Sequence, residues 1–88
     1  MLEKKIEGYL KAKAKMAGGL AIKWVSPGFA GVPDRILIMP GGRIVFVELK
    51  APGKKPTPLQ ARIIQMLVDR GADVRVADSM EKVDEIFT

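Results

Sequence analysis

The 88-residue sequence contains no cysteine and no histidine, and these two absences exclude much of the usual chemistry of protein sites. Without cysteine there is no disulfide, no thiolate metal site and no cysteine nucleophile. Without histidine, the usual zinc sites and catalysis of the Ser-His-Asp type are excluded as well. Any metal bound here must therefore be a hard cation held by oxygen ligands.

The sequence also lacks long apolar runs. None approaches the ~20 residues of a membrane-spanning helix, and the N-terminal "MLEKKIEGYL" is too charged for a secretory signal. We therefore expect a cytoplasmic protein. At 88 residues the chain predicts a single domain, 1–88, whose core is small enough that association into a homodimer is expected.

What the chain does have is positive charge. The formal net charge is +5, with an isoelectric point near 9.8. This balance favours a polyanionic partner such as nucleic acid. Because many small basic domains bind no nucleic acid, the charge has to be supported by a motif.

Hydrophobic periodicity and turn residues predict the element order α-β-β-β-α-β-α. Helix two begins with "TPLQ", in which Thr57 is a good N-cap and Gln60 completes a capping box. This helix connects the third and fourth strands, which should run parallel. The fold class is therefore α/β, with helices around a four-stranded mixed sheet. In chain order we expect a helix over 2–17, strands over 20–25, 34–39 and 43–49, a helix from 58 to about 70, a strand over 73–78, and a short helix from Asp78 with a capping box to Glu81.

The third strand, "RIVFVEL", ends in charge. Alternation places Ile44, Phe46, Glu48 and Lys50 on one face, and the apolar residues between them on the other. Both faces are apolar along most of the strand, which predicts a central strand covered on both sides. An unpaired buried charge costs several kcal/mol, so Glu48 and Lys50 require partners.

The turn before this strand determines whether a second acid joins them. A three-residue loop over 40–42 places Met39 opposite Arg43 and Asp34 opposite Glu48, with Cβ atoms roughly 5 Å apart on one face. A two-residue Gly-Gly loop pairs Asp34 with Leu49 instead and sends the two carboxylates to opposite faces. We expect the three-residue loop.

Two carboxylates this close in a partly dry site repel each other, so one takes up a proton or a cation lies between them. Oxygen ligands indicate Mg²⁺ or Mn²⁺. Lys50 beside such an ion could orient or deprotonate a water, or equally stabilise negative charge on a phosphate. A metal, a lysine and a basic surface together indicate hydrolysis of phosphodiester bonds.

At this point the motifs carry a family resemblance. "GVPD" (31–34), followed thirteen residues later by "VELK" (47–50), resembles the PD-(D/E)XK nuclease signature. With "SPG", "PGGR", "ELKAPG" and the "LQ" of "APGKKPTPLQ" in order, the run 26–60 resembles the VRR-NUC domain, the virus-type replication-repair nuclease, in its short stand-alone form from phages and bacteria. The resemblance implies a restriction-endonuclease-like core and a location inside a bacterial or phage-infected host cell.

The resemblance also implies roles. Asp34 and Glu48 would bind metal with the backbone carbonyl of Leu49, Lys50 would be the catalytic lysine, and Gln60 would support the site or the scissile phosphate. Family members carry a glutamate in the first helix three residues before an apolar position. Glu3 has that spacing to Ile6 and is expected as the outer or water-mediated ligand, with Glu7 as the fallback.

Each of these residues also has a plainer interpretation. Glu48 and Lys50 could form a strand-end salt bridge, Asp34 could begin a strand, and Gln60 could serve only the capping box. Glu3 and Glu7 could serve the helix dipole. Lys54 and Lys55 could form a solvated loop, although their place after the strand favours contact with DNA phosphates. Further expected DNA contacts are Ser26, Arg35 and Lys23.

Taken together, the sequence predicts a Mg²⁺- or Mn²⁺-dependent, structure-selective DNA endonuclease. Stand-alone members of this family resemble Holliday junction resolvases, and a homodimer with two sites would suit a four-way junction. A flap- or nick-directed nuclease of the same chemistry is the nearest rival. A non-catalytic nucleic-acid-binding module is less consistent with five aromatic residues and a full set of acids and lysine.

Overall fold

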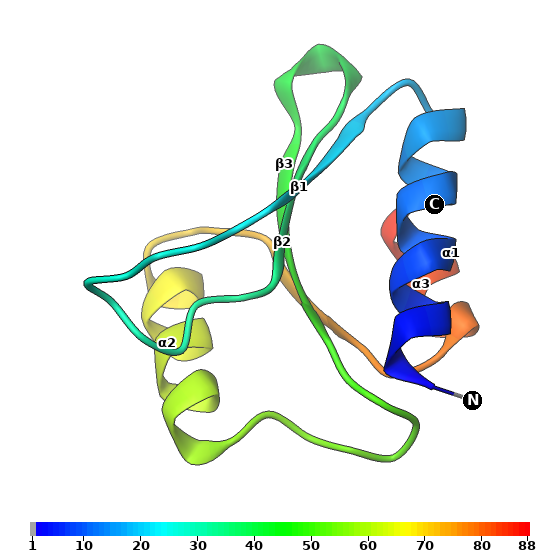
Figure 1. Ribbon diagram of the computed structural model, residues 1–88. Helices are drawn as coiled ribbons and strands as arrows, with labels where there is room; N and C mark the ends of the chain where they lie inside the picture. The colour runs from blue at the N-terminus through cyan, green and yellow to red at the C-terminus, as the bar shows by residue number, and fades with distance from the viewer. Residues whose placement is uncertain (1) are drawn as a thin grey trace.

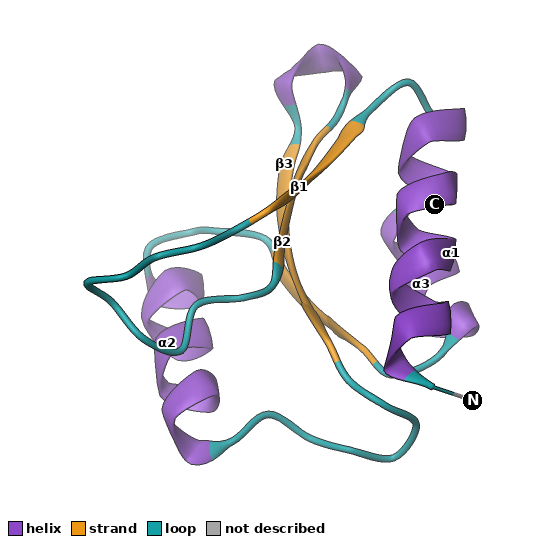
Figure 2. Cartoon of the chain, in the orientation of Figure 1, coloured by secondary structure: helices purple, strands orange, loops and turns teal. Residues whose placement is uncertain are grey.

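Alternating apolar residues build a four-stranded sheet in the order β1-β2-β3-β4, with helices on both of its faces (Figures 1 and 2). The computed structural model describes residues 2–88. β2 pairs antiparallel with β1 and β3, whereas β4 pairs parallel with β3, so the predicted element order and mixed sheet are confirmed. The elements are α1 (Glu3–Met16), β1 (Leu20–Lys23), β2 (Arg35–Ile38), the 3₁₀ turn η1 (Pro40–Gly42), β3 (Ile44–Leu49), α2 (Pro58–Asp69), β4 (Val74–Ala77) and α3 (Met80–Ile86).

The main core lies between the sheet and the pair α1 and α3 (Figure 1). One face of β3 contributes Val45, Val47 and Leu49, which are almost fully buried. Each large aliphatic side chain buried in this way stabilises the fold by roughly 1.5–3 kcal/mol. The remaining members of this core are Ile6, Leu10 and Ala14 of α1, Leu37 and Met39 of the hairpin, Ala77 of β4, and Val83 and Ile86 of α3.

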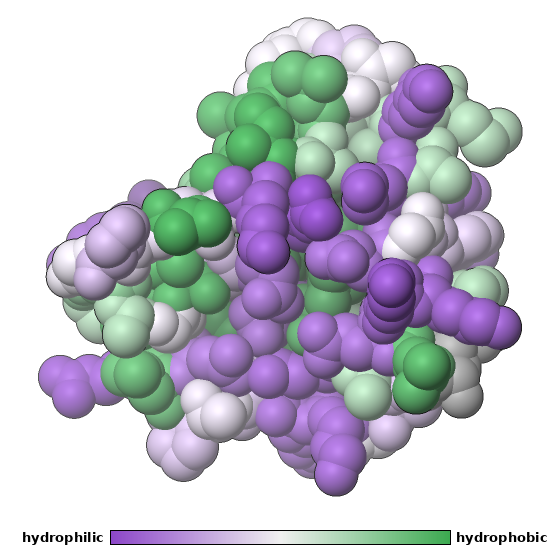
Figure 3. Space-filling view, viewed as in Figure 1, coloured by the Kyte–Doolittle hydropathy of each residue, from purple (hydrophilic) through white to green (hydrophobic). Residues whose placement is uncertain are grey.

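The opposite face of the sheet is only partly covered. Phe46 of β3 packs against Trp24, with ring centroids 5.2 Å apart, and α2 lies on this side (Figure 1). Near the hairpin, however, Leu20, Ile22 and Ile44 are between 47% and 61% exposed. Figure 3 shows a patch of apolar side chains beside the hairpin. The expectation that β3 is central is confirmed, but its cover on this second face is incomplete because α2 packs nearer to β4.

The hairpin between β2 and β3 has the three-residue loop. The backbone N–H of Met39 donates to the carbonyl of Arg43 at 2.8 Å, with η1 between them. Gly41 and Gly42 both have φ near +84°, at 84° and 83°, a conformation that strongly favours glycine. The ladder pairs residue 35 with residue 47, so one step further places Asp34 opposite Glu48.

The loop between β1 and β2 fits against α2 through Gly31. This glycine has φ +90°, and a Cβ there would lie 3.0 Å from side-chain atoms of Ile63 and Leu59. Any larger residue would therefore push the loop away from the helix. Since the loop leads directly into Asp34, this contact helps to fix where β2 begins.

Two predicted boundaries need correction. β1 ends at Lys23 rather than residue 25, although the N–H of Trp24 still donates to the carbonyl of Asp34 at 2.9 Å. The N-cap of α3 is Ser79, whose side chain accepts from the N–H of Lys82, and not Asp78. Asp78 instead accepts a hydrogen bond from the N–H of Gly53 at 3.2 Å. The expected capping box to Glu81 was therefore wrong.

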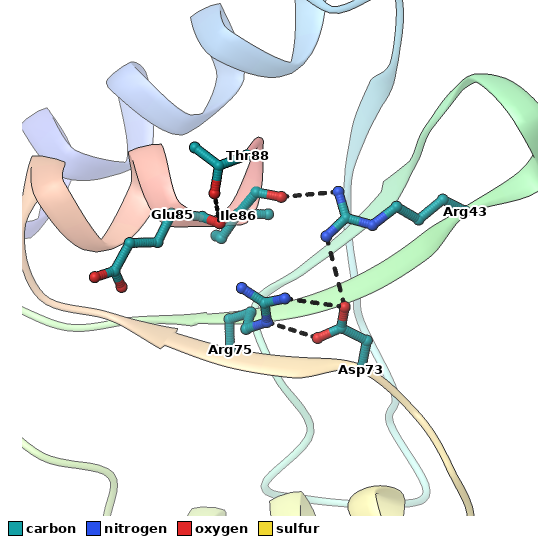
Figure 4. A network of polar contacts seen from close by, with 6 residues as sticks. All are labelled: Arg43, Asp73, Arg75, Glu85, Ile86 and Thr88. Atoms are coloured by element: carbon teal, nitrogen blue, oxygen red, sulfur yellow. Dashed lines mark hydrogen bonds and ion pairs between the residues drawn. The ribbon is translucent and has the colours of Figure 1, made fainter.

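At the end of the sheet where β3 and β4 begin, a polar network connects these strands to the C-terminal end of α3 (Figure 4). Arg43 donates to the carbonyl of Ile86 at 2.8 Å and lies 3.6 Å from Asp73. Arg75 binds the same carboxylate at 2.6 Å. This network links β3, β4 and the C-terminal turn of α3.

Within residues 2–88, no helix combines the length and the apolar character that crossing a membrane requires.

Candidate active site at the carboxyl end of β3

The geometry predicted for the acids and the lysine is confirmed. Asp34 directly precedes β2, Glu48 lies in β3, and Lys50 directly follows β3. Because β2 and β3 are antiparallel, the start of one strand lies beside the end of the other. The continued register places Asp34 and Glu48 on one face of the sheet, and the Lys50 Nζ lies 3.3 Å from the Glu48 Oε2.

Glu48 is the one charged residue among the buried side chains of the described chain, with an exposed fraction of 1%. Its Oε1 is buried and has no hydrogen-bond partner. Burial raises the pKa of Glu48 to about 7, and the charge of Asp34 contributes in the same direction. Lys50 opposes both effects but does not cancel them. Near neutral pH this carboxylate is therefore short of positive charge.

Asp34 is held in place by the backbone of β3. Its Oδ2 accepts the N–H of Leu49 at 2.8 Å. This bond ties the acid that directly precedes β2 to the strand that carries Glu48, so the Asp34 carboxylate is held in one orientation. The site is therefore built in and at the ends of paired strands, which favours a well-defined geometry.

Lys50 is connected to α2 through Gln60. The Lys50 Nζ donates to the Gln60 Oε1 at 2.7 Å, and the Lys50 side chain is only 15% exposed. Gln60 also completes the predicted capping box: its side chain accepts from the N–H of Thr57, and the Thr57 hydroxyl accepts from the N–H of Gln60. The capping role is confirmed, and the same amide also touches the lysine. Sequence reasoning identified Thr57 only as a cap, although its position in the motif run could have placed it beside the site.

The two glutamates of α1 have different surroundings. The negative charge of Glu3 adds to the rise in the pKa of Glu48, which places Glu3 on the side of the site. Glu7 Oε2 instead lies 3.1 Å from the Arg35 Nη2. Glu7 is thus paired with a cation inside the protein, whereas the charge of Glu3 acts on Glu48.

The expected DNA contacts fall into two groups. Lys54, Lys55 and Lys23 are exposed, and Ser26 is half-buried in the loop after β1. Arg35 differs from these, because its side chain is 12% exposed and donates to Glu7 and to the carbonyl of Ala21. The guanidinium of Arg35 therefore has its partners inside the protein. This corrects the expectation that Arg35 lies on the surface available to DNA.

The donor set is suited to a hard cation, although it is small. Within residues 2–88, no group of three or more acidic, histidine or cysteine side chains lies together as a metal site. What the structure does provide is a pair of acids, Asp34 and Glu48, of which Glu48 has a buried oxygen without a partner. A cation beside that oxygen would supply the missing positive charge, and carboxylate oxygens are the ligands that Mg²⁺ and Mn²⁺ prefer.

Comparison with known proteins identifies the family. The family model of the VRR-NUC domain matches residues 7–81. A protein named "Putative nuclease p44", from Acyrthosiphon pisum secondary endosymbiont phage 1, is 49% identical over 79 residues, covering 90% of this chain and 85% of the phage protein. A solved VRR-NUC domain structure superposes with a TM-score of 0.91 at 35% identity, covering 99% of this chain and 96% of the other. The chain therefore belongs to the VRR-NUC family, the virus-type replication-repair nuclease domains that its motifs resembled.

Proposed function

We propose that this protein is a divalent-metal-dependent DNA endonuclease that hydrolyses phosphodiester bonds at branched DNA. The observation that carries the proposal is the buried carboxylate of Glu48, with one unpartnered oxygen, beside Asp34 and Lys50 in a member of the VRR-NUC family. The relative named as a nuclease supports the same activity. The protein would act inside a bacterial or phage-infected cell, where such DNA occurs.

Asp34 and Glu48 would hold Mg²⁺ or Mn²⁺ together with the backbone carbonyl of Leu49, and Glu3 would bind from α1, directly or through a water. When bound, such an ion supplies Lewis-acid chemistry: it polarises the phosphate and makes a water more acidic. Because burial raises the pKa of Glu48 to about 7, this side chain must give up any proton before it can act as a ligand.

Lys50 contributes positive charge at the edge of this site. Its Nζ has Gln60 Oε1 and Glu48 Oε2 as partners, and an ammonium has three donors. One donor therefore remains for a phosphate oxygen, where the developing negative charge would be stabilised. Gln60 holds the ammonium from the side of α2 while the ammonium also pairs with Glu48.

DNA would be bound mainly through its backbone. Lys54 and Lys55 lie exposed in the loop that follows β3. Lys23 is the last residue of β1, and Ser26 lies in the loop after it. Lysine contacts to phosphates position DNA without reading base sequence. Selectivity would therefore come from the shape of the DNA, which suits a junction, with flap- or nick-directed cleavage as the rival within the same chemistry.

We further propose that two copies associate through the open face of the sheet. Leu20, Ile22 and Ile44 are exposed there, and Ile36 and Ile38 lie half-buried in the same rows of paired strands. The paired rows contain no charged side chain, so two chains of net charge +5 could meet there without like-charge contacts. The mass in solution tests this part: Ile22→Lys should convert a dimer into a monomer, and a wild-type monomer would contradict it.

The activity is tested with purified protein and labelled four-way junction, flap, nicked and linear duplex DNA, each with MgCl₂, MnCl₂ or EDTA. The proposal expects metal-dependent cutting that is strongest on the four-way junction and absent in EDTA. Cutting that is strongest on flaps or nicks would favour the rival nuclease. DNA binding without metal-dependent cutting of any substrate would instead indicate a non-catalytic binding module.

A further inference from the structure

The side-chain amide of Gln60 has two donors on the same oxygen. Its Oε1 accepts from the Lys50 Nζ at 2.7 Å and from the backbone N–H of Thr57 at 2.9 Å. Neither an ammonium nor a backbone N–H can accept a hydrogen bond. The amide is therefore oriented with its oxygen toward Lys50, and a flip that presented the amide nitrogen would break both bonds.

Thr57 makes two hydrogen bonds with Gln60, one to its backbone and one to its side chain. Its hydroxyl accepts the N–H of Gln60 at 3.2 Å, which holds the first turn of α2, and its N–H binds the Gln60 side chain. The loop 51–56 separates Thr57 from Lys50 in the chain, so this capping box is the structural link between α2 and the lysine.

The link matters because Lys50 has a competing partner. Its Nζ lies 3.3 Å from the Glu48 Oε2, and opposite charges attract more strongly in a buried site. If Gln60 loses its orientation, its oxygen no longer holds Lys50, and the ammonium keeps only its contact with Glu48 Oε2. The ammonium would then move closer to this carboxylate and compete with a cation for its oxygens.

We propose that Thr57 is a positioning residue for DNA cleavage, which acts through Gln60 to hold the Lys50 ammonium beside the acids. This inference rests on the proposed function, since it assigns a role in that same site. The capping box of α2 would then serve cleavage as well as stabilise the start of the helix. The effect should appear in kcat rather than KM, because the Thr57 hydroxyl accepts the N–H of Gln60 and acts through that residue.

Ser79 provides a matched control. It is also an N-cap, and its hydroxyl accepts from the N–H of Lys82 at 3.1 Å, as Thr57 does from Gln60, but it begins α3 and has no bond to the site. We expect Thr57→Ala and Ser79→Ala to lower the melting temperature similarly. Thr57→Ala should lower kcat on the order of tenfold to a hundredfold, as misplaced catalytic groups do. Ser79→Ala should leave kcat unchanged, and Thr57→Ser should restore it.

A second measurement does not depend on activity. In metal-free protein, the NMR order parameter of the Lys50 side-chain end should fall in Thr57→Ala and stay at the wild-type value in Ser79→Ala. Where Thr57→Ala is too unstable, Thr57→Gly removes the same hydroxyl while keeping a residue that N-caps tolerate.

The outcomes separate the two proposals. Equal kcat in Thr57→Ala and Ser79→Ala, with an unchanged Lys50 order parameter, would overturn the positioning role and leave the nuclease intact. Wild-type protein that cuts no DNA would overturn the proposed function, while the order parameters would still report whether Thr57 holds Lys50.

Discussion

Both ends of β3 carry charged side chains, but only one end leaves a charge short of partners. At the amino end, the Asp73 carboxylate receives Arg75 at 2.6 Å and Arg43 at 3.6 Å, and all three side chains are between 37% and 40% exposed. At the carboxyl end, Glu48 is 1% exposed, and its Oε1 has no hydrogen-bond partner. Lys50 is the one cation within reach of that carboxylate in the described structure.

The difference distinguishes a structural cluster from the candidate active site. Around Asp73, two guanidinium groups pair with a partly exposed carboxylate, and the network joins strands to a helix end (Figure 4). Around Glu48, two acids share a dry site, and the pKa of Glu48 rises to about 7. A fold retains such an arrangement at a cost in stability, and perturbed pKa values of this kind gather at functional sites.

The largest effect should come from removing the acid or the lysine at the carboxyl end. We expect Asp34→Ala and Lys50→Ala each to lower the cleavage rate by on the order of 1000-fold or more, because the first removes a proposed metal ligand and the second the charge proposed to stabilise the phosphate. Folding and DNA binding should be largely retained. Single-turnover cleavage of a labelled junction, beside circular dichroism and gel-shift binding, measures all three.

Asp73→Ala is the matched control, since it removes the same type of side chain beside the other end of β3. Cleavage should stay within about twofold of the wild-type rate. Near wild-type cutting by Asp34→Ala or Lys50→Ala would refute the assigned roles, and a large loss in Asp73→Ala would show that the two ends are not functionally distinct.

The second effect concerns stability and pH. The pKa of Glu48 is about 7 in the folded protein and 4.5 ordinarily, so the folded state holds this proton more tightly than the unfolded state. The stabilising contribution of this proton to the folded state is complete below pH 4.5 and is lost as the pH rises through 7. The difference corresponds to about 3 kcal/mol. In EDTA, Glu48→Gln should therefore be more stable than wild type at pH 8 by up to this amount, and equal to it at pH 4.

Denaturant unfolding of both proteins between pH 4 and 8 measures this difference. The shape of the curve is diagnostic, because only the titration of Glu48 is removed by the substitution. A difference between the two proteins that stays constant with pH would mean that burial of Glu48 does not set its protonation.

A third effect distinguishes the two glutamates of α1. Glu3→Gln should slow cleavage by roughly 10- to 100-fold, as is usual when an outer partner of a metal site is removed. Glu7→Gln should leave the rate nearly unchanged but cost about 1–3 kcal/mol, because it weakens the partner of the largely buried Arg35 guanidinium. Rates and unfolding free energies of the two variants test this, and the opposite pattern would make Glu7 the outer ligand.

The sequence was sufficient for the parts of the site that lie on paired strands. Alternation placed Glu48 and Lys50 on one face, and the hairpin loop then paired Glu48 with Asp34. The loop length was the uncertain step, because Gly41 and Gly42 fit a two-residue turn as well as the three-residue one. The structure resolves it through Met39, which bonds Arg43 across the longer loop.

The parts that could not be predicted depend on how separate elements pack. Periodicity places both Glu3 and Glu7 on similar faces of α1, but only tertiary structure brings Arg35 to Glu7. Similarly, Asp78 and Ser79 are both good N-cap residues. In the structure, the Asp78 side chain accepts the N–H of Gly53, and Ser79 is the N-cap of α3.

The smallest effect should come from substituting Asp73 at the amino end of β3. Its response to salt should differ from that of the Glu48 substitution. Asp73→Asn weakens two exposed ion pairs, which costs at most about 1 kcal/mol. In 1 M NaCl the Debye length is about 3 Å, so this loss should largely disappear. The effect of Glu48→Gln at pH 8 should persist in the same salt, because burial rather than an exposed partner causes it. Unfolding of both variants at low and high salt provides the comparison, and a salt-resistant loss in Asp73→Asn would show that its network is also dry.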